Sequence, residues 1–119
     1  MAVRAEVYRW DGSAKKAVGS ALYESAPRTI SFSDSAFHSA SFSPTVPVTS
    51  MQTYLLFLSF DKDYRSCSAA SLKWGAVGDN TDGPGTFVYQ NNGGNASRWT
   101  TASWKIYGLD LAFIASVSP

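Results

Sequence analysis

The chain has 119 residues, of which 45% are hydrophobic and 16% charged, and its formal net charge is +1. This length can bury one hydrophobic core without disulfide bonds, so we expect a single domain over residues 1–119. The weakly charged composition excludes the basic patch by which proteins bind nucleic acid. A single cysteine, Cys67, and a single histidine exclude an internal disulfide bond and a Cys/His zinc cluster.

The first third of the chain predicts short strands separated by turns. Apolar and polar side chains alternate over residues 3–10, which is typical of a strand with one face toward solvent. Asp11-Gly12-Ser13 follows with residues that favour a turn. Further short strands are predicted over residues 21–24, 28–33 and 37–43, the last with a bulge or a change of face.

Residues 53–60, Thr-Tyr-Leu-Leu-Phe-Leu-Ser-Phe, are the segment around which we expect the rest of the chain to be arranged. Their apolar side chains do not alternate with polar ones, and the segment is too short for an ordinary helix. We therefore predict a strand that is covered on both faces and lies at the centre of a sheet.

The second half of the chain continues this alternation of strands and loops. Residues 61–66 predict an exposed polar loop. Strands are predicted over residues 72–77, 86–90, 104–107 and 110–117, with loops at residues 78–85 and 91–95. Eight or nine short strands without a helical period favour an all-β fold, an antiparallel β-sandwich of jelly-roll type. A closed barrel is the structural alternative.

No stretch of the sequence approaches the roughly 18 apolar residues of a membrane-spanning helix. The N-terminus lacks a basic segment followed by an apolar run, so we expect no signal peptide in this chain. The protein is then either made in the cytoplasm or present here in a mature or trimmed form.

The sequence contains no motif that specifies catalysis. His38 is the only histidine and no Gly-x-Ser-x-Gly elbow accompanies it, so we interpret it as a surface or hydrogen-bonded strand residue. Two carboxylates at the right separation could hydrolyse a glycoside. However, Asp61, Asp63, Asp79 and Asp82 lie in polar segments typical of solvated turns. We therefore predict that the protein is not an enzyme.

The aromatic residues indicate a binding function instead. Four tryptophans and six tyrosines are many amphipathic rings for a small sandwich. Sugar-binding modules stack pyranose rings on such side chains and hydrogen-bond the hydroxyl groups with Asn, Asp or Gln. Trp99 lies in a polar segment, so we predict an exposed aromatic platform there, whereas Trp74 and Trp104 are predicted to pack in the core. The predicted ligand-binding residues are Trp99, Tyr89, Asn91, Asn92 and Asn95.

Calcium is the second ligand that the sequence suggests. The segment Asp79-Asn80-Thr81-Asp82-Gly83 offers two carboxylates and further oxygen atoms on a tight loop, and calcium binds through oxygen. The segment lacks the spacing of an EF-hand and its final glutamate, so an acidic turn without a metal is the alternative. Asp79 and Asp82 are the predicted calcium ligands.

Six segments of the chain, in this order, resemble a known family. They are Ala5-Glu6-Val7-Tyr8-Arg9-Trp10-Asp11-Gly12, Ala21-Leu22-Tyr23-Glu24-Ser25, Tyr54-Leu55-Leu56-Phe57-Leu58-Ser59, Trp74-Gly75, Phe87-Val88-Tyr89-Gln90-Asn91-Asn92-Gly93, and Trp104 followed by Asp110-Leu111-Ala112-Phe113. Together they resemble an all-β domain of bacterial exported and surface proteins, often just ahead of a C-terminal sorting signal of the PEP-CTERM or choice-of-anchor kind. The resemblance implies a secreted or cell-surface β-sandwich without enzymatic activity.

Three features depart from that family. Ser50 or Met51 stands where a glycine usually precedes the central strand, only residues 1–4 stand where relatives have at least one more strand, and no anchor follows Pro119. A sandwich without its first strand exposes an edge that can pair with another chain. Two functions stay open: a module that binds a carbohydrate or surface polymer, and a structural module that forms a homodimer through this edge without a small-molecule ligand.

Overall fold

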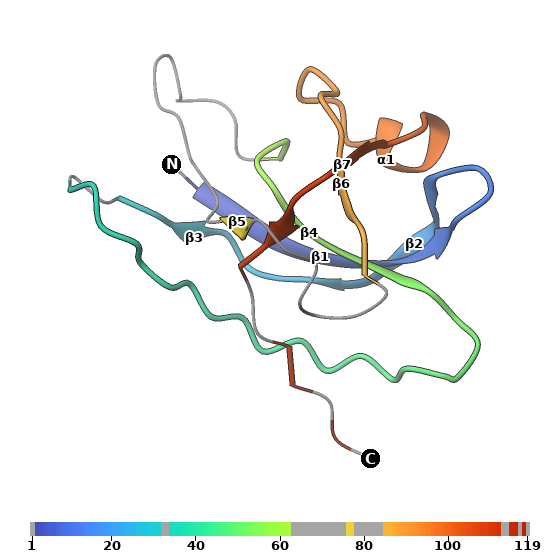
Figure 1. Ribbon diagram of the computed structural model, residues 1–119, viewed down its shortest axis with the longest axis horizontal. Helices are drawn as coiled ribbons and strands as arrows, with labels where there is room; N and C mark the ends of the chain where they lie inside the picture. The colour runs from blue at the N-terminus through green and yellow to red at the C-terminus, as the bar shows by residue number, and fades with distance from the viewer. Residues whose placement is uncertain are drawn as a thin grey trace.

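The structure is a computed structural model, and it describes residues 2–31, 34–62, 76–77, 85–112, 115–116 and 118. Strands dominate the described residues, which confirms the predicted all-β class (Figure 1). The elements are β1 (Ala2–Asp11), β2 (Lys16–Glu24), β3 (Arg28–Thr29), β4 (Tyr54–Ser59), β5 (Ala76–Val77), β6 (Phe87–Tyr89), α1 (Arg98–Thr101), β7 (Lys105–Tyr107) and β8 (Asp110–Leu111). Among these residues, no helix is long and apolar enough to cross a membrane.

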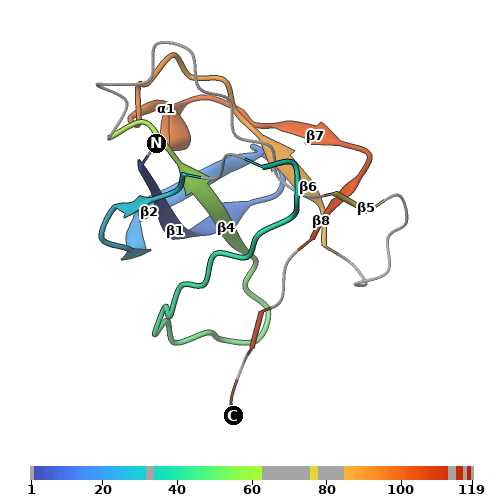
Figure 2. The same cartoon turned by 90° about the vertical axis from the view of Figure 1, so that its left-hand side faces the viewer.

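β1 is the central strand of the main antiparallel sheet. Its residue Glu6 faces Glu24 of β2 on one edge and Phe57 of β4 on the other, while β3 pairs with the start of β1. Figure 2 shows β2, β1 and β4 side by side. The prediction that residues 53–60 lie at the centre of a sheet is therefore wrong, because β4 has only β1 as a strand partner among the described residues.

The burial of β1 and β4 is the reverse of the predicted pattern. All residues from 5 to 8 in β1 are buried, so the predicted solvent face of this strand is absent. In β4, Leu55 and Phe57 are buried but Leu56 between them is 47% exposed. Coverage of the two faces of a strand depends on what packs on the sheet, and in this fold residues 5–8 of β1 are the covered ones.

Several other predicted strands are present but shorter than expected. The predictions at 28–33, 86–90 and 104–107 correspond to the shorter strands β3, β6 and β7, whereas the strand predicted at 21–24 is longer, because β2 begins at Lys16. Residues 37–43 form no strand, and Phe37 is 91% exposed. Within residues 72–77 and 110–117, the structure describes the pairing of β5 with β8. The sequence does not predict α1, because its four residues are too few for a helical period.

The main core cluster lies on the face of the sheet that α1 covers. It contains Tyr8, Ala17, Leu55, Phe57, Trp99 and Trp104. The ring centroid of Phe57 lies 4.9 Å from that of Trp99 and 5.0 Å from that of Trp104, both in the edge-to-face geometry that aromatic pairs prefer. Trp104 is thus in the core as predicted, while Trp74 and Cys67 lie outside the described residues.

Candidate binding groove

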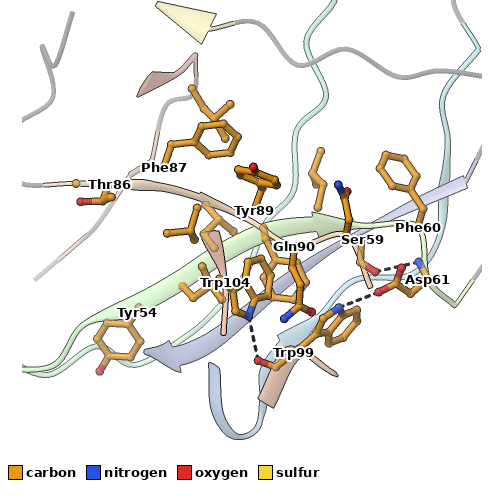
Figure 3. Close-up of a pocket in the computed structure, with 18 residues that line it drawn as sticks. Tyr54, Ser59, Phe60, Asp61, Thr86, Phe87, Tyr89, Gln90, Trp99 and Trp104 are labelled. Atoms are coloured by element: carbon orange, nitrogen blue, oxygen red, sulfur yellow. Dashed lines mark hydrogen bonds between the residues drawn. The ribbon is translucent and has the colours of Figure 1, made fainter. Parts of the chain in front are cut away.

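A groove with a volume of about 470 Å³ lies between β4 and β6. Figure 3 shows its lining, with side chains that come from β4, from β6 and from the segment around α1. The described lining residues are those of β4 (Tyr54–Ser59), then Phe60, Asp61, residues 85–91, Trp99, Trp104 and Leu111. Aromatic and aliphatic side chains therefore provide most of the surface, and a few polar groups are placed among them.

Tyr89 provides a half-buried aromatic ring on the β6 side of the groove. β6 pairs with β7, which places Tyr107 beside Tyr89 and Phe87. The Tyr89 ring centroid lies 6.2 Å from that of Tyr107 and 6.4 Å from that of Phe87. These contacts hold the ring in place without covering it, so Tyr89 can present an aromatic surface to a ligand.

Trp99 is a wall of the groove, but it is not the exposed platform that its polar sequence neighbours predict. Its side chain is buried, with 3% of the residue exposed. α1 folds it onto Phe57, and its indole Nε1 donates a hydrogen bond of 2.8 Å to the Asp61 carboxylate. The backbone oxygen of Trp99 in turn accepts a hydrogen bond of 3.0 Å from Trp104 Nε1. A buried indole needs such a polar partner, and Asp61 supplies it.

Asp61 is the polar residue of the groove that the sequence does not identify. It follows β4 directly and is half-buried, whereas a solvated loop is predicted there. Its Oδ2 accepts hydrogen bonds from Trp99 and from Asn92 Nδ2, and its backbone N–H donates to Ser59 Oγ at 3.1 Å. Its second oxygen, Oδ1, has no hydrogen-bond partner among the described residues. Asp61 therefore holds Trp99 in the wall of the groove, and as far as the described residues go its Oδ1 remains an acceptor there.

Of the five predicted ligand-binding residues, Tyr89, Asn91 and Trp99 line the groove. Asn91 is exposed, so its amide is available to a ligand. The other two have structural roles. Asn92 is buried, donates to Asp61 and accepts from the backbone N–H of Gly94 at 3.1 Å. Asn95 accepts hydrogen bonds from Ser97 ahead of α1.

The remaining predicted sites are either on the surface or outside the described residues. His38 is exposed on a loop, where its Nε2 lies 2.6 Å from Asp34 Oδ1. This hydrogen bond is the main cause that lowers the pKa of Asp34. Asp63 and the predicted calcium ligands Asp79 and Asp82 lie outside the described residues. In the part that is described, no group of three or more His, Cys, Asp or Glu side chains could hold a metal ion.

Gln90 ties the strand β6 to α1. Its Nε2 donates to the backbone oxygens of Arg98 and Ala102, at 2.9 and 3.1 Å. Its Oε1 is buried and has no partner among the described residues. These two hydrogen bonds fix the distance between the β6 side of the groove and the segment that carries Trp99.

A charged cluster, Arg4, Glu6, Glu24 and Lys62, lies beside the groove. Glu24 is held by Lys62 Nζ through its Oε2 and by Arg4 Nη1, 3.6 Å from its Oε1. The hydrogen bond from Lys62 is the largest cause that lowers the pKa of Glu24, and the same bond raises the pKa of Lys62. Both of these ion pairs are made with Glu24, and within the described ranges no ion pair joins Arg4 or Lys62 to Glu6.

Glu6 is fully buried, with 0% of its surface exposed. Neither carboxyl oxygen has a hydrogen-bond partner among the described residues. Burial is the largest cause that raises the pKa of Glu6 to about 7. Glu24 also raises the pKa of Glu6, both as a nearby hydrogen-bond acceptor and as a negative charge. In this arrangement the two carboxyl groups form no hydrogen bond with each other. Lys62 and Arg4 oppose the rise but do not cancel it.

The chain was compared with protein-family models, with curated proteins and with solved structures. No family model, curated protein or solved structure matches it.

Proposed function

We propose that the protein is a non-enzymatic binding module that takes a carbohydrate into the groove between β4 and β6. The observation that carries this proposal is the lining of the groove, which combines half-buried Tyr89, exposed Asn91 and Asp61, whose Oδ1 has no hydrogen-bond partner among the described residues. A sugar has apolar ring faces and hydroxyl donors. The ring of Tyr89 can stack on the apolar face of a sugar, and the Asn91 amide and the Asp61 carboxylate can accept hydrogen bonds from its hydroxyl groups.

The dimensions of the groove support this assignment. Small-molecule sites in proteins usually enclose about 300–1,000 Å³ and combine apolar walls with a few polar groups. The volume of about 470 Å³ falls in that range. Asp61 is the only carboxylate among the described lining residues, so a neutral ligand with several hydroxyl groups fits better than a strongly charged one.

The jelly-roll sandwich and the extracellular location belong to the same proposal. The antiparallel pair of β6 and β7 supports the sandwich, because it contributes Val88 to the border of the core on the face of the sheet that α1 also covers. The resemblance to domains of exported bacterial proteins supports a secreted or cell-surface location. A surface polymer of the same or another cell is then the natural source of the carbohydrate.

A glycan array probed with the labelled protein tests the proposal, once with calcium and once with a chelator. We expect a defined set of sugars to bind. Loss of that signal on chelation would support calcium at Asp79 and Asp82, which remains a prediction. A blank array in both conditions would contradict the carbohydrate proposal.

Tyr89→Ala is expected to weaken binding of any sugar found on the array by about tenfold or more, because the stacking surface is lost. Tyr23→Ala is the matched control. Tyr23 is also a half-buried tyrosine but lies on β2 and does not line the groove. Titration calorimetry with the purified sugar measures both. Equal affinities for Tyr89→Ala and the wild type would place the binding site elsewhere.

A structural module that assembles through a sheet edge is the second candidate, and it is favoured by the edge of β4 that no other described strand pairs with. Trp10 N–H donates to Thr53 O, and antiparallel alternation then directs the backbone groups of Tyr54, Leu56 and Leu58 away from β1. Among the described residues these groups have no strand partner. An exposed row of this kind can pair with a second copy of the chain.

If the chain forms a homodimer through this edge, the amides of Tyr54, Leu56 and Leu58 will exchange slowly with solvent at high protein concentration and quickly at low concentration. The amides of Leu55 and Phe57 point toward β1 and serve as the internal control, since their protection should not depend on concentration. Amide hydrogen exchange by NMR, combined with light scattering, gives both readings. A monomer at high concentration would exclude the edge-pairing candidate.

A further inference from the structure

We propose that Glu6, Glu24 and Lys62 form a proton-operated switch beside the groove, in which loss of the Glu6 proton to solvent draws Lys62 away from Glu24 and changes the surroundings of the Trp99 ring. The switch is a property of the folded chain and does not depend on what the groove binds.

The first support is the position of Glu6. It is 0% exposed, and both its carboxyl oxygens lack a hydrogen bond among the described residues. A buried carboxylate without hydrogen bonds is costly, whereas a neutral carboxylic acid is far less so. The arrangement in the structure therefore suits the protonated form of Glu6 and does not suit the ionised form.

The second support is the set of charged and titratable groups that face Glu6. Glu24 lies directly opposite it on β2, Arg4 and Tyr8 lie on β1, and Lys62 follows β4. On β4 the residue opposite Glu6 is Phe57, whose apolar side chain offers no hydrogen bond. Burial and Glu24 together raise the pKa of Glu6 to about 7, against the opposing effect of Lys62 and Arg4. Loss of the proton would thus occur near neutral pH.

The third support is the contact between this cluster and the wall of the groove. When Glu6 is neutral, the Lys62 ammonium pairs with Glu24. When Glu6 loses its proton, two carboxylates compete for this ammonium across one strand pair. Lys62 is the neighbour of Asp61 in sequence, and its Nζ lies 5.9 Å from the centre of the Trp99 ring. Because Asp61 accepts the indole hydrogen bond of Trp99, movement of Lys62 changes the surroundings of this ring.

Two measurements on the full chain test the switch, and neither requires a ligand. The first is an NMR titration of the side-chain carboxyl carbons, in which we expect a midpoint near pH 7 for Glu6. Glu24→Gln should lower that midpoint by about one pH unit, because the neighbouring negative charge is removed. A Glu6 midpoint below pH 5 would overturn the proposal.

The second measurement is tryptophan fluorescence between pH 5 and 8.5. We expect a transition with the same midpoint as Glu6, absent in Glu6→Gln and in Trp99→Phe. His38→Gln is the control and should retain the transition, because histidine is the other kind of side chain that changes charge in this range. If the transition persists in Glu6→Gln, or if Glu6 titrates near pH 7 without any change in fluorescence, the proposed coupling to Trp99 is wrong. Both readings stand even if no sugar binds.

Discussion

Replacing Trp99 with alanine is expected to lower the free energy of unfolding by about 3–5 kcal/mol, the usual cost of removing a buried tryptophan ring. Trp99 is 3% exposed and makes edge-to-face contacts with Phe57 and Tyr8. The substitution also removes the indole donor to Asp61. Because domains are commonly stable by only about 5–15 kcal/mol, this single change would bring the protein near the limit of folding.

Urea unfolding followed by circular dichroism measures this loss without relying on the fluorescence of the missing ring. Trp99→Phe keeps an aromatic ring but not the N–H group, so we expect a smaller loss of about 1–2 kcal/mol from the missing hydrogen bond. Phe37→Ala is the control, since Phe37 is 91% exposed and its loss should change stability by less than about 0.5 kcal/mol. An unfolding midpoint for Trp99→Ala equal to that of the wild type would contradict the buried position of this ring.

The sequence predicts the fold class well and the order of burial poorly. Short apolar segments separated by Gly, Asn and Asp identify the positions of β4, β6 and β7, because strand and turn propensities are local properties. Which strand is central depends on its neighbours in space. The composition of residues 53–60 suggests two covered faces, yet β1 occupies the central position. The central position of β1 cannot be recognised from its sequence, because β1 contains polar residues such as Glu6 and a glutamate is normally exposed to solvent.

The groove is partly visible in the sequence and partly not. Tyr89 and Asn91 can be proposed from residue type alone, because aromatic and amide side chains in a loop-rich segment are typical of sugar sites. The burial of Trp99 cannot be predicted in this way, because its hydrogen-bond partner Asp61 is 38 residues away in the chain. Asn92 shows the same limit, since its side chain also bonds to Asp61. Local polarity describes the neighbours of a residue in sequence, and these contacts are long-range.

The pH dependence of stability gives the second large expected effect. In the folded protein the pKa of Glu6 is about 7, against 4.5 for an ordinary glutamate. A pKa raised by folding contributes stability that is complete below pH 4.5 and is lost as the pH rises through 7. At 1.36 kcal/mol per pKa unit, the loss is about 3 kcal/mol. The lowered pKa of Glu24 changes the stability only at pH values below this window, and the raised pKa of Lys62 changes it only at pH values above the window.

Glu6→Gln removes the titrating group but keeps the shape of the side chain. Relative to the wild type, this variant should therefore become more stable by about 3 kcal/mol between pH 4.5 and pH 8. Urea unfolding of both proteins at several pH values in this interval measures the difference. Gln52→Glu is the control, because Gln52 is exposed and a carboxyl group at such a position contributes little pH dependence, so this variant should keep the wild-type profile in this window. Parallel profiles for Glu6→Gln and the wild type would mean that Glu6 is already ionised in the folded chain, with a counter-ion that compensates its burial.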